Sequence, residues 1–250
     1  MPGLRQRGFT LTEMAVVFVI VGFLLASALY TLSAQMEQRN FDETRRRVEA
    51  AKELLLAFAI VNGRLPCPGT TTGDEAFTAA NCTSPWGGFL PGRAIGFQIV
   101  DTSGFALDAW QNRIRYAVSS NSVALFGCAG TNTQPHFTNT ANLKANGITC
   151  QPGDLVVCSR SPATVTATTC DAGTSVTNQN TVVAIVFSTG KNGATGGTGL
   201  NEARNLDNNR LFVSRTPDPS SATGGEFDDQ MAWIAVGELY GRLISAGVLP

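Results

Sequence analysis

An uncharged apolar run near the N-terminus is the feature that most restricts how this chain can fold. Residues 14–32 read MAVVFVIVGFLLASALYTL, and these 19 residues are close to the length of a helix that crosses a bilayer. The preceding segment, MPGLRQRG, carries two arginines, which predicts that the N-terminus stays in the cytoplasm. No small-residue cleavage site of a secretory signal follows the run promptly. Everything after about residue 33 is therefore expected outside the cytoplasm.

One acidic residue, Glu13, lies at the start of the apolar run. A carboxylate near hydrocarbon is costly unless it is paired, so Glu13 is a candidate for function. The alternative is that Glu13 lies at the membrane interface, remains hydrated and has no role. The choice between these two interpretations depends on the residues around it.

The hexapeptide Gly8-Phe9-Thr10-Leu11-Thr12-Glu13 resembles the type IV prepilin cleavage and methylation motif. The short basic leader and Gly22, where these helices often have glycine, extend the resemblance. It implies that a membrane aspartyl peptidase cuts between Gly8 and Phe9, that Phe9 is N-methylated and that Glu13 is retained. Many major pilins carry a helix-bending proline where this chain has Tyr30, which favours a minor pilin or pseudopilin.

The resemblance also implies how the subunits assemble and with which partners. Cleavage creates a cationic amine on Phe9, and Glu13 of a neighbouring subunit can neutralise this amine where water is scarce. The expected partners are other pilin or pseudopilin subunits, the prepilin peptidase and methyltransferase, and an inner-membrane assembly platform. The filament would belong to a type IV pilus or a type II secretion system.

The expected organisation has four parts. These are a leader at 1–8, a transmembrane and assembly helix at 9–32, its amphipathic continuation at 33–63 and a periplasmic globular domain at 64–250. Val48, Ala51, Leu55 and Phe58 follow helical spacing, and Asn62-Gly63 is a typical helix end. Arg45–Arg47 allows a phosphate or lipid-headgroup patch, but the surrounding acids favour a solvated, salt-bridged face.

The globular region predicts an α+β fold in which the long helix packs on an antiparallel sheet, with long disulfide-bearing loops and a short C-terminal helix. The expected strands are Ile95–Val100, Arg113–Val118, Val123–Phe126, Leu155–Cys158 and Val182–Phe187, with the second and third paired through a turn at 119–122. The polar stretch 159–181 is expected to be a loop. Helical spacing within 230–249 predicts a helix that ends at Gly247.

Six cysteines, all outside the apolar run, favour disulfides in an oxidising compartment. They allow 15 full pairings, and proximity along the chain favours Cys67–Cys82, Cys128–Cys150 and Cys158–Cys170. The alternative is that some of them are free and buried.

Two further segments resemble pseudopilins. The stretch Leu107–Tyr116 resembles their D-x-W-G-N-x-x-x-Y segment, although Gln111 replaces the glycine. Residues 184–233 resemble their C-terminal loop, which in major pseudopilins binds calcium. The resemblance implies calcium ligands at Ser188, Asn192, Asp228 and Asp229, within a preferred shell of about six to eight oxygens. The alternative is that the paired aspartates cap a following helix.

Composition and motifs argue against other functions. Charged residues make up 15% of the chain and the net charge is −1, without the basic face of a nucleic-acid binder. The single histidine, His136, is expected to be exposed, and no motif for a catalytic or phosphate-binding site is present. A structural subunit is therefore expected, with a tip subunit that binds a surface, cargo or DNA as the alternative and a membrane-anchored enzyme as the weakest hypothesis.

Overall fold

The computed structural model describes residues 10–78, 81–119, 135–164, 166–197, 199–219 and 225–249, except for the side chains of residues 27–32. The elements in chain order are α1 (Leu11–Asn62), β1 (Phe77–Thr78), β2 (Asn81–Cys82), β3 (Gly88–Phe89), α2 (Gly92–Ile95), β4 (Arg115–Val118), α3 (Thr140–Asn146), η1 (Gly147–Thr149), β5 (Val156–Cys158), β6 (Val182–Ser188), η2 (Gly193–Thr195), α4 (Leu200–Asn205), β7 (Leu211–Val213), β8 (Gln230–Ala235) and α5 (Val236–Ser245).

Helix α1 contributes to two compact units, whose boundary falls between Asp42 and Glu43. It ends at Asn62, and Gly63 follows with a φ of 67°. This end is where the sequence predicts it, because glycine readily adopts the left-handed conformation that stops a helix. Within the described part of the chain, no helix has both the length and the apolar character needed to cross a membrane.

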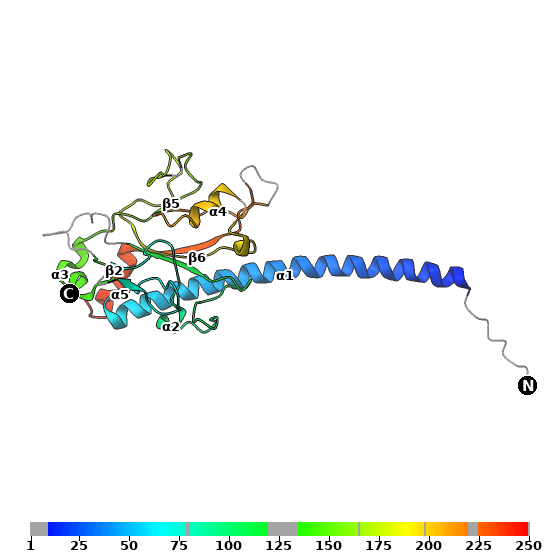
Figure 1. The fold of residues 1–250 in the computed structure, drawn as a ribbon, viewed down its shortest axis with the longest axis horizontal. Coiled ribbons are helices and arrows are strands. Elements are labelled where there is room, and N and C mark those ends of the chain that lie inside the picture. The colour runs from blue at the N-terminus through cyan, green and yellow to red at the C-terminus, as the bar shows by residue number, and fades with distance from the viewer. Residues whose placement is uncertain are drawn as a thin grey trace, which may run out of the picture. The chain divides into compact units, whose positions relative to one another are not determined.

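The unit that begins at Glu43 is built around a four-stranded antiparallel sheet with the strand order β3-β4-β6-β8. Figure 1 shows this sheet between the final part of α1 on one side and β5 and α4 on the other. Strands β5 and β7 form a separate parallel pair, which the sequence analysis did not predict. The α+β arrangement of a long helix, an antiparallel sheet and a short C-terminal helix is confirmed.

Strand β6 lies in the middle of this arrangement and is buried along its whole length. Ala184 and Val186 pack in the same core as Leu55 of α1, whereas Ile185 and Phe187 pack with Val157 and Phe212 of the β5–β7 pair. Alternate side chains of a strand point to opposite faces, so a strand covered on both faces needs apolar residues at every position. The unbroken apolar run at 182–187 has this origin.

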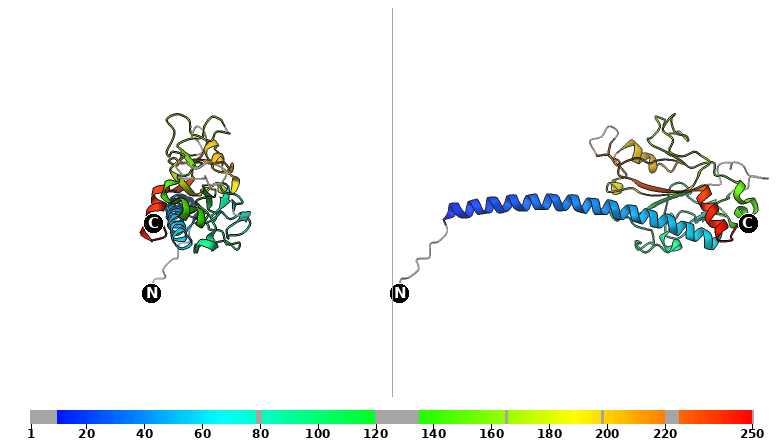
Figure 2. Two further views of the ribbon diagram at one scale, coloured as in Figure 1. Left: turned by 90° about the vertical axis from the view of Figure 1, so that its left-hand side faces the viewer. Right: turned by 180° about the vertical axis from the view of Figure 1, so that it is seen from behind.

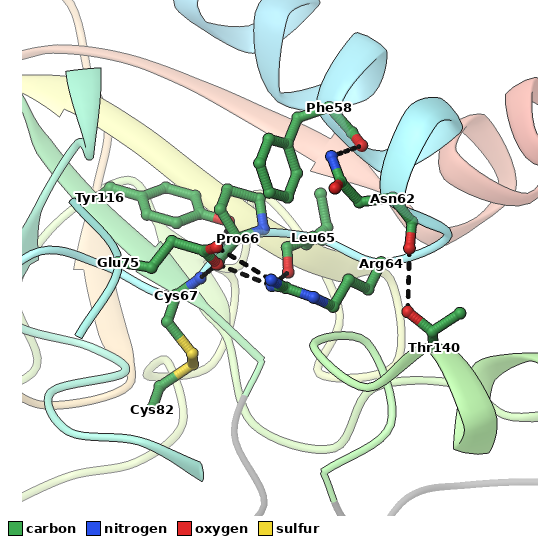
Figure 3. Close-up of polar contacts among 10 residues, drawn as sticks. All are labelled: Phe58, Asn62, Arg64, Leu65, Pro66, Cys67, Glu75, Cys82, Tyr116 and Thr140. Carbon is green, nitrogen blue, oxygen red and sulfur yellow. Dashed lines mark hydrogen bonds and ion pairs between the residues drawn. A yellow bond between two sulfur atoms is a disulfide. The ribbon is translucent and has the colours of Figure 1, made fainter. Parts of the chain in front are cut away.

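The end of α1 is fixed to the domain by hydrogen bonds of backbone carbonyls (Figure 3). The Thr140 hydroxyl donates to the Asn62 carbonyl over 2.9 Å, and the Asn62 side chain donates to the Phe58 carbonyl over 2.9 Å. The bond from Thr140 satisfies a carbonyl of the last turn that has no partner within the helix. The Tyr116 hydroxyl of β4 donates to the Pro66 carbonyl over 3.1 Å and so holds the chain after the helix.

Glu75 organises the loop that follows α1, as Figure 3 also shows. It accepts two hydrogen bonds from Arg64, of 2.6 and 2.9 Å, and one of 2.8 Å from the Cys67 amide. A two-pronged arginine–carboxylate pair fixes both partners in orientation. The Cys67–Cys82 disulfide closes the same loop.

Helix α5 packs beside the last turns of α1, which Figure 2 shows from behind with α5 in red and α1 in cyan. Leu239 and Leu243 are fully buried in the core that contains Leu55 and Leu56. Lys52 also forms an ion pair with Glu238 over 3.0 Å. The burial carries most of this packing energy, because partly exposed ion pairs contribute little.

The structure pairs Cys67 with Cys82 and Cys158 with Cys170, two of the pairings that proximity favours. Cys150 is disulfide-bonded as well, and Cys128 lies outside the described residues. The second disulfide joins β5 to the stretch 159–181, in which the structure forms no strand among the described residues, as expected of a loop.

Two secondary-structure predictions are wrong, and a third lies partly outside the described residues. Ile95–Val100 is not a strand, because α2 ends at Ile95 and Gly96 turns the chain with a φ of 75°. Strand β4 pairs with β3 and β6. Its predicted hairpin partner, Val123–Phe126, lies outside the described residues, so the predicted hairpin is not tested. Residues 230–235 form β8 rather than helix, and only Val236–Ser245 is helical.

The expectation that His136 is exposed is also wrong. The residue is 1% exposed, and its Nε2 lies 3.1 Å from the Tyr240 hydroxyl of α5. The Tyr240 hydroxyl in turn donates to the Cys150 carbonyl. The Thr- and Asn-rich stretch around His136 conceals its burial. The adjacent ring of Phe137 lies against it, and Tyr240 of α5 reaches it from a distant part of the chain.

The segment that resembles D-x-W-G-N-x-x-x-Y begins with a turn at residues 107–112. Gln111, which replaces the family glycine, has a φ of 68° in the left-handed region. A residue with a Cβ atom is strained there, whereas glycine is not.

Replacing Gln111 with glycine is therefore expected to raise the free energy of unfolding by roughly 0.5–1 kcal/mol, or about 1–4 °C in melting temperature. The comparison is Gln98→Gly, since Gln98 is exposed and not among the described residues with positive φ. This control is expected to destabilise the protein. A lower melting temperature for Gln111→Gly would contradict the assignment of strain.

Candidate functional site

Among the described residues, two places carry candidate functional groups, and the first is the start of α1. Thr10 precedes the helix, and its amide donates to Glu13 Oε2 over 2.8 Å, while the Glu13 amide donates to Thr10 Oγ1 over 3.3 Å. The Thr10 hydroxyl also donates to Glu13 Oε2 over 2.8 Å. This reciprocal capping box satisfies amides that have no partner within the helix. It holds the Glu13 carboxylate close to the start of the helix.

The first turns of α1 expose apolar side chains along residues 11–26. Leu11 is 87% exposed, Phe23 77% and Val19 72%. A contiguous apolar surface of this kind is rare on a soluble monomer and indicates contact with lipid or protein.

The second candidate is an acidic cluster formed by Glu202, Asp228 and Asp229. One carboxylate oxygen of each residue lies within 4.8 Å of the others, and all three residues are buried. Glu202 comes from α4, whereas the aspartates immediately precede β8. The loop after β6 approaches the same cluster, because the Lys191 amide donates to Asp228 Oδ2 over 2.8 Å.

Neighbouring amides orient the three carboxylates. The Asn192 side chain donates to both Glu202 oxygens, over 3.0 and 3.1 Å. The Asn205 side chain donates to Asp229 Oδ2 over 2.6 Å, and the Asp228 amide donates to Glu202 Oε1 over 3.0 Å. Asp228 Oδ1 and Asn192 Oδ1 are buried without a hydrogen-bond partner. The cluster thus contains one carboxylate oxygen and one amide oxygen that accept no hydrogen bond.

The electrostatics of the cluster resist ionisation. Burial raises the pKa of Asp228 to about 7, and the nearby Glu202 carboxylate acts in the same direction, while the Lys191 amide opposes them. Burial also raises the pKa of Asp229 well above its ordinary value, and the charges of Glu202 and Asp228 add to this effect. A divalent cation would offset the repulsion between the three carboxylates, and the two oxygens without a hydrogen-bond partner could coordinate it. The donor set therefore fits a hard cation such as calcium.

Comparison with known proteins addresses the first site. Residues 3–29 match the family model described as the prokaryotic N-terminal methylation motif. The chain carries a prokaryotic N-terminal methylation motif. This match supports the resemblance to the type IV pilin and pseudopilin family. Proteins of that family are generally structural rather than enzymatic. No curated protein and no solved structure matches the chain.

Within the hexapeptide 8–13, the structure describes Thr10 to Glu13, while Gly8 and Phe9 lie outside the described residues. The capping box was not part of the sequence analysis. Its signal is present in the sequence, because threonine followed three residues later by glutamate before an apolar run is typical of this cap.

The residues implied as calcium ligands only partly come together. Asp228 and Asp229 lie in one cluster, and Asn192 contacts its third carboxylate. The Ser188 hydroxyl instead donates to Asp108 Oδ2 over 2.6 Å. The alternative of a helix cap for the aspartates is wrong, because they precede strand β8. Glu202 was missed, since it lies 26 residues before Asp228 and only the fold brings them together.

Proposed function

We propose that this protein is a structural subunit of a type IV pilus or type II secretion filament, inserted in the inner membrane and assembled through its N-terminal helix. The observation that carries the proposal is the methylation motif at residues 3–29, which runs directly into a helix with exposed apolar side chains. The uncharged run at 14–32 supplies the length for a membrane span. Residues beyond this run, including the cysteines, would lie in the periplasm.

Processing would turn the start of the helix into an assembly device. The prepilin peptidase would cut between Gly8 and Phe9, and the Phe9 amine would then be N-methylated. This cation and the Glu13 carboxylate are each costly in an apolar phase, but they tolerate it together. Pairing across two subunits would fix the axial register of neighbouring helices. The capping box supports this role, because it holds the carboxylate near the start of the helix.

A minor pilin or minor pseudopilin fits the chain better than a major subunit. Tyr30 stands where many major pilins carry the helix-bending proline. The inner-membrane assembly platform and other pilin or pseudopilin subunits would be its partners.

A calcium ion in the acidic cluster would serve the stability of this subunit. Glu202, Asp228 and Asp229 would hold it, with Asn192 close enough to contribute its free oxygen. The ion would supply positive charge among buried carboxylates. These residues would thereby join three separate segments: the loop after β6, α4 and the start of β8.

Replacing Glu13 with valine tests the assembly role. The variant is expected to insert in the membrane as the native chain does but to be lost from sheared filament fractions by at least about tenfold, because the Phe9 amine loses its partner. Glu49→Val is the matched control, since Glu49 is an exposed residue of the same helix. Filament incorporation of Glu13→Val at the native level would contradict the proposal.

A further inference from the structure

The turn at 107–112 joins α1 of the domain to the loop that carries the acidic cluster. At the helix, Arg47 Nη1 donates to the carbonyls of Asp108, over 2.7 Å, and Leu107, over 3.2 Å. The Ala109 amide donates to Thr44 Oγ1 over 3.1 Å, and Thr44 is completely buried. The turn is therefore fixed to the first turns of α1 within this unit.

The buried Asp108 carboxylate holds the turn together. Its Oδ1 accepts the amides of Trp110, over 2.9 Å, and Asn112, over 2.8 Å. Its Oδ2 accepts the Ser188 hydroxyl at the end of β6 over 2.6 Å. Charged hydrogen bonds of this kind are among the stronger ones, so the turn and the end of β6 form one rigid piece.

The same piece continues to the acidic cluster through Gly190. The Asn112 side chain donates to the Gly190 carbonyl over 2.7 Å, and the Gly190 amide donates to Ser188 Oγ over 3.1 Å. The next amide, that of Lys191, donates to Asp228 Oδ2. A Cβ atom on Gly190 would lie 2.0 Å from Asp228 Oδ1, so the loop and the carboxylate are in direct contact.

We propose that the 107–112 turn is a strut through which cation binding at the acidic cluster strengthens the docking of residues 43–51 of α1. The inference rests on the proposed cation site. Asp228 Oδ1 is a buried oxygen without a partner, and a cation that takes it fixes the carboxylate whose other oxygen holds Lys191. By linkage, docking of the helix raises the affinity for the cation by the same factor.

Hydrogen exchange measured by mass spectrometry on the full-length protein in detergent tests the strut. Calcium chloride, compared with a chelator, is expected to slow amide exchange in residues 43–51 by about 5-fold or more. Asn112→Ala removes the link to Gly190 without changing a cluster carboxylate. In this variant calcium is still expected to raise the melting temperature. Amide hydrogen exchange in residues 43–51, however, is expected to become insensitive to calcium.

Two further variants separate the strut from general damage. Thr44→Val keeps the shape of a buried side chain and removes the hydroxyl that accepts the Ala109 amide. It is therefore expected to uncouple residues 43–51 from the cation site, as Asn112→Ala does. Asn178→Ala, on an exposed residue of the 159–181 loop, is expected to retain the native response.

The outcomes distinguish the strut from the cation site. A calcium-dependent melting temperature in the native protein, without slower exchange at 43–51, overturns the strut and leaves the cation site in place. Slower exchange that persists in both Asn112→Ala and Thr44→Val also overturns the strut. Absence of any calcium effect on melting overturns the cation site and the strut together.

Discussion

Chelating divalent cations is expected to lower the melting temperature of the full-length protein in detergent by about 8–16 °C relative to saturating calcium. A ligand at about 1,000 times its dissociation constant stabilises the folded state by about 4 kcal/mol, and each kcal/mol shifts melting of a domain this size by about 2–4 °C. The effect is large because the cluster buries Glu202, Asp228 and Asp229 against one another. The measurement is a thermal melt in calcium chloride and in chelator.

The variant Asp228→Asn distinguishes loss of the cation from a general loss of stability, because the two change the melting temperature in chelator in opposite directions. The variant removes one buried charge and keeps the shape, so it is expected to melt higher than the native protein in chelator and to lose the calcium shift. Asp171→Asn is the matched control, because Asp171 is exposed and is not one of the three cluster residues. A native shift below about 1 °C in millimolar calcium would remove the cation from the proposal.

Acidification is expected to destabilise the protein through His136. Burial lowers the pKa of this imidazole to about 4, below the ordinary value of about 6.5 in the unfolded chain. The neutral form is therefore favoured in the fold, and its contribution is present above pH 6.5 and lost as the pH falls towards 4. Between pH 7.5 and 4.5 this loss amounts to about 2–3 kcal/mol.

The buried Asp228 acts in the opposite direction in cation-free protein. Its pKa is raised to about 7, so its contribution is present at low pH and lost as the pH rises through 7. Comparing the native protein with His136→Gln at each pH cancels this term. Urea unfolding is expected to show a smaller loss on acidification for His136→Gln, which cannot titrate but can still bond Tyr240. Equal losses would show that the buried imidazole does not control acid stability.

Local patterns predicted the parts of the fold that local physics decides. Val48, Ala51 and Leu55 at helical spacing are buried, Phe58 is partly buried, and the helix ends at the expected Asn62-Gly63. The apolar run at 182–187 is the central strand. In contrast, Ile234 and Leu239 follow helical spacing but belong to different elements, a strand that ends at Ala235 and the helix after it. The spacing therefore predicted one helix where the chain forms a strand and a helix.

Long-range contacts account for what the sequence did not predict. His136 is covered by α5, about a hundred residues later in the chain, and the Thr- and Asn-rich stretch around it does not indicate this contact. Glu202 stands alone after a glycine-rich stretch, and only the return of the chain to β8 places it beside Asp228. The adjacent pair Asp228-Asp229 was recognisable because both residues already stood together in a segment with a family resemblance.

Intact-mass analysis of the membrane form tests the central claim most directly. The chain would be expressed in cells with an active prepilin peptidase and extracted from the inner membrane. The proposal predicts a mass that lacks residues 1–8 and includes one methyl group, which fragmentation places on the amine of Phe9. A chain that retains Met1 in these cells would contradict the claim that this N-terminus is processed for assembly into a filament.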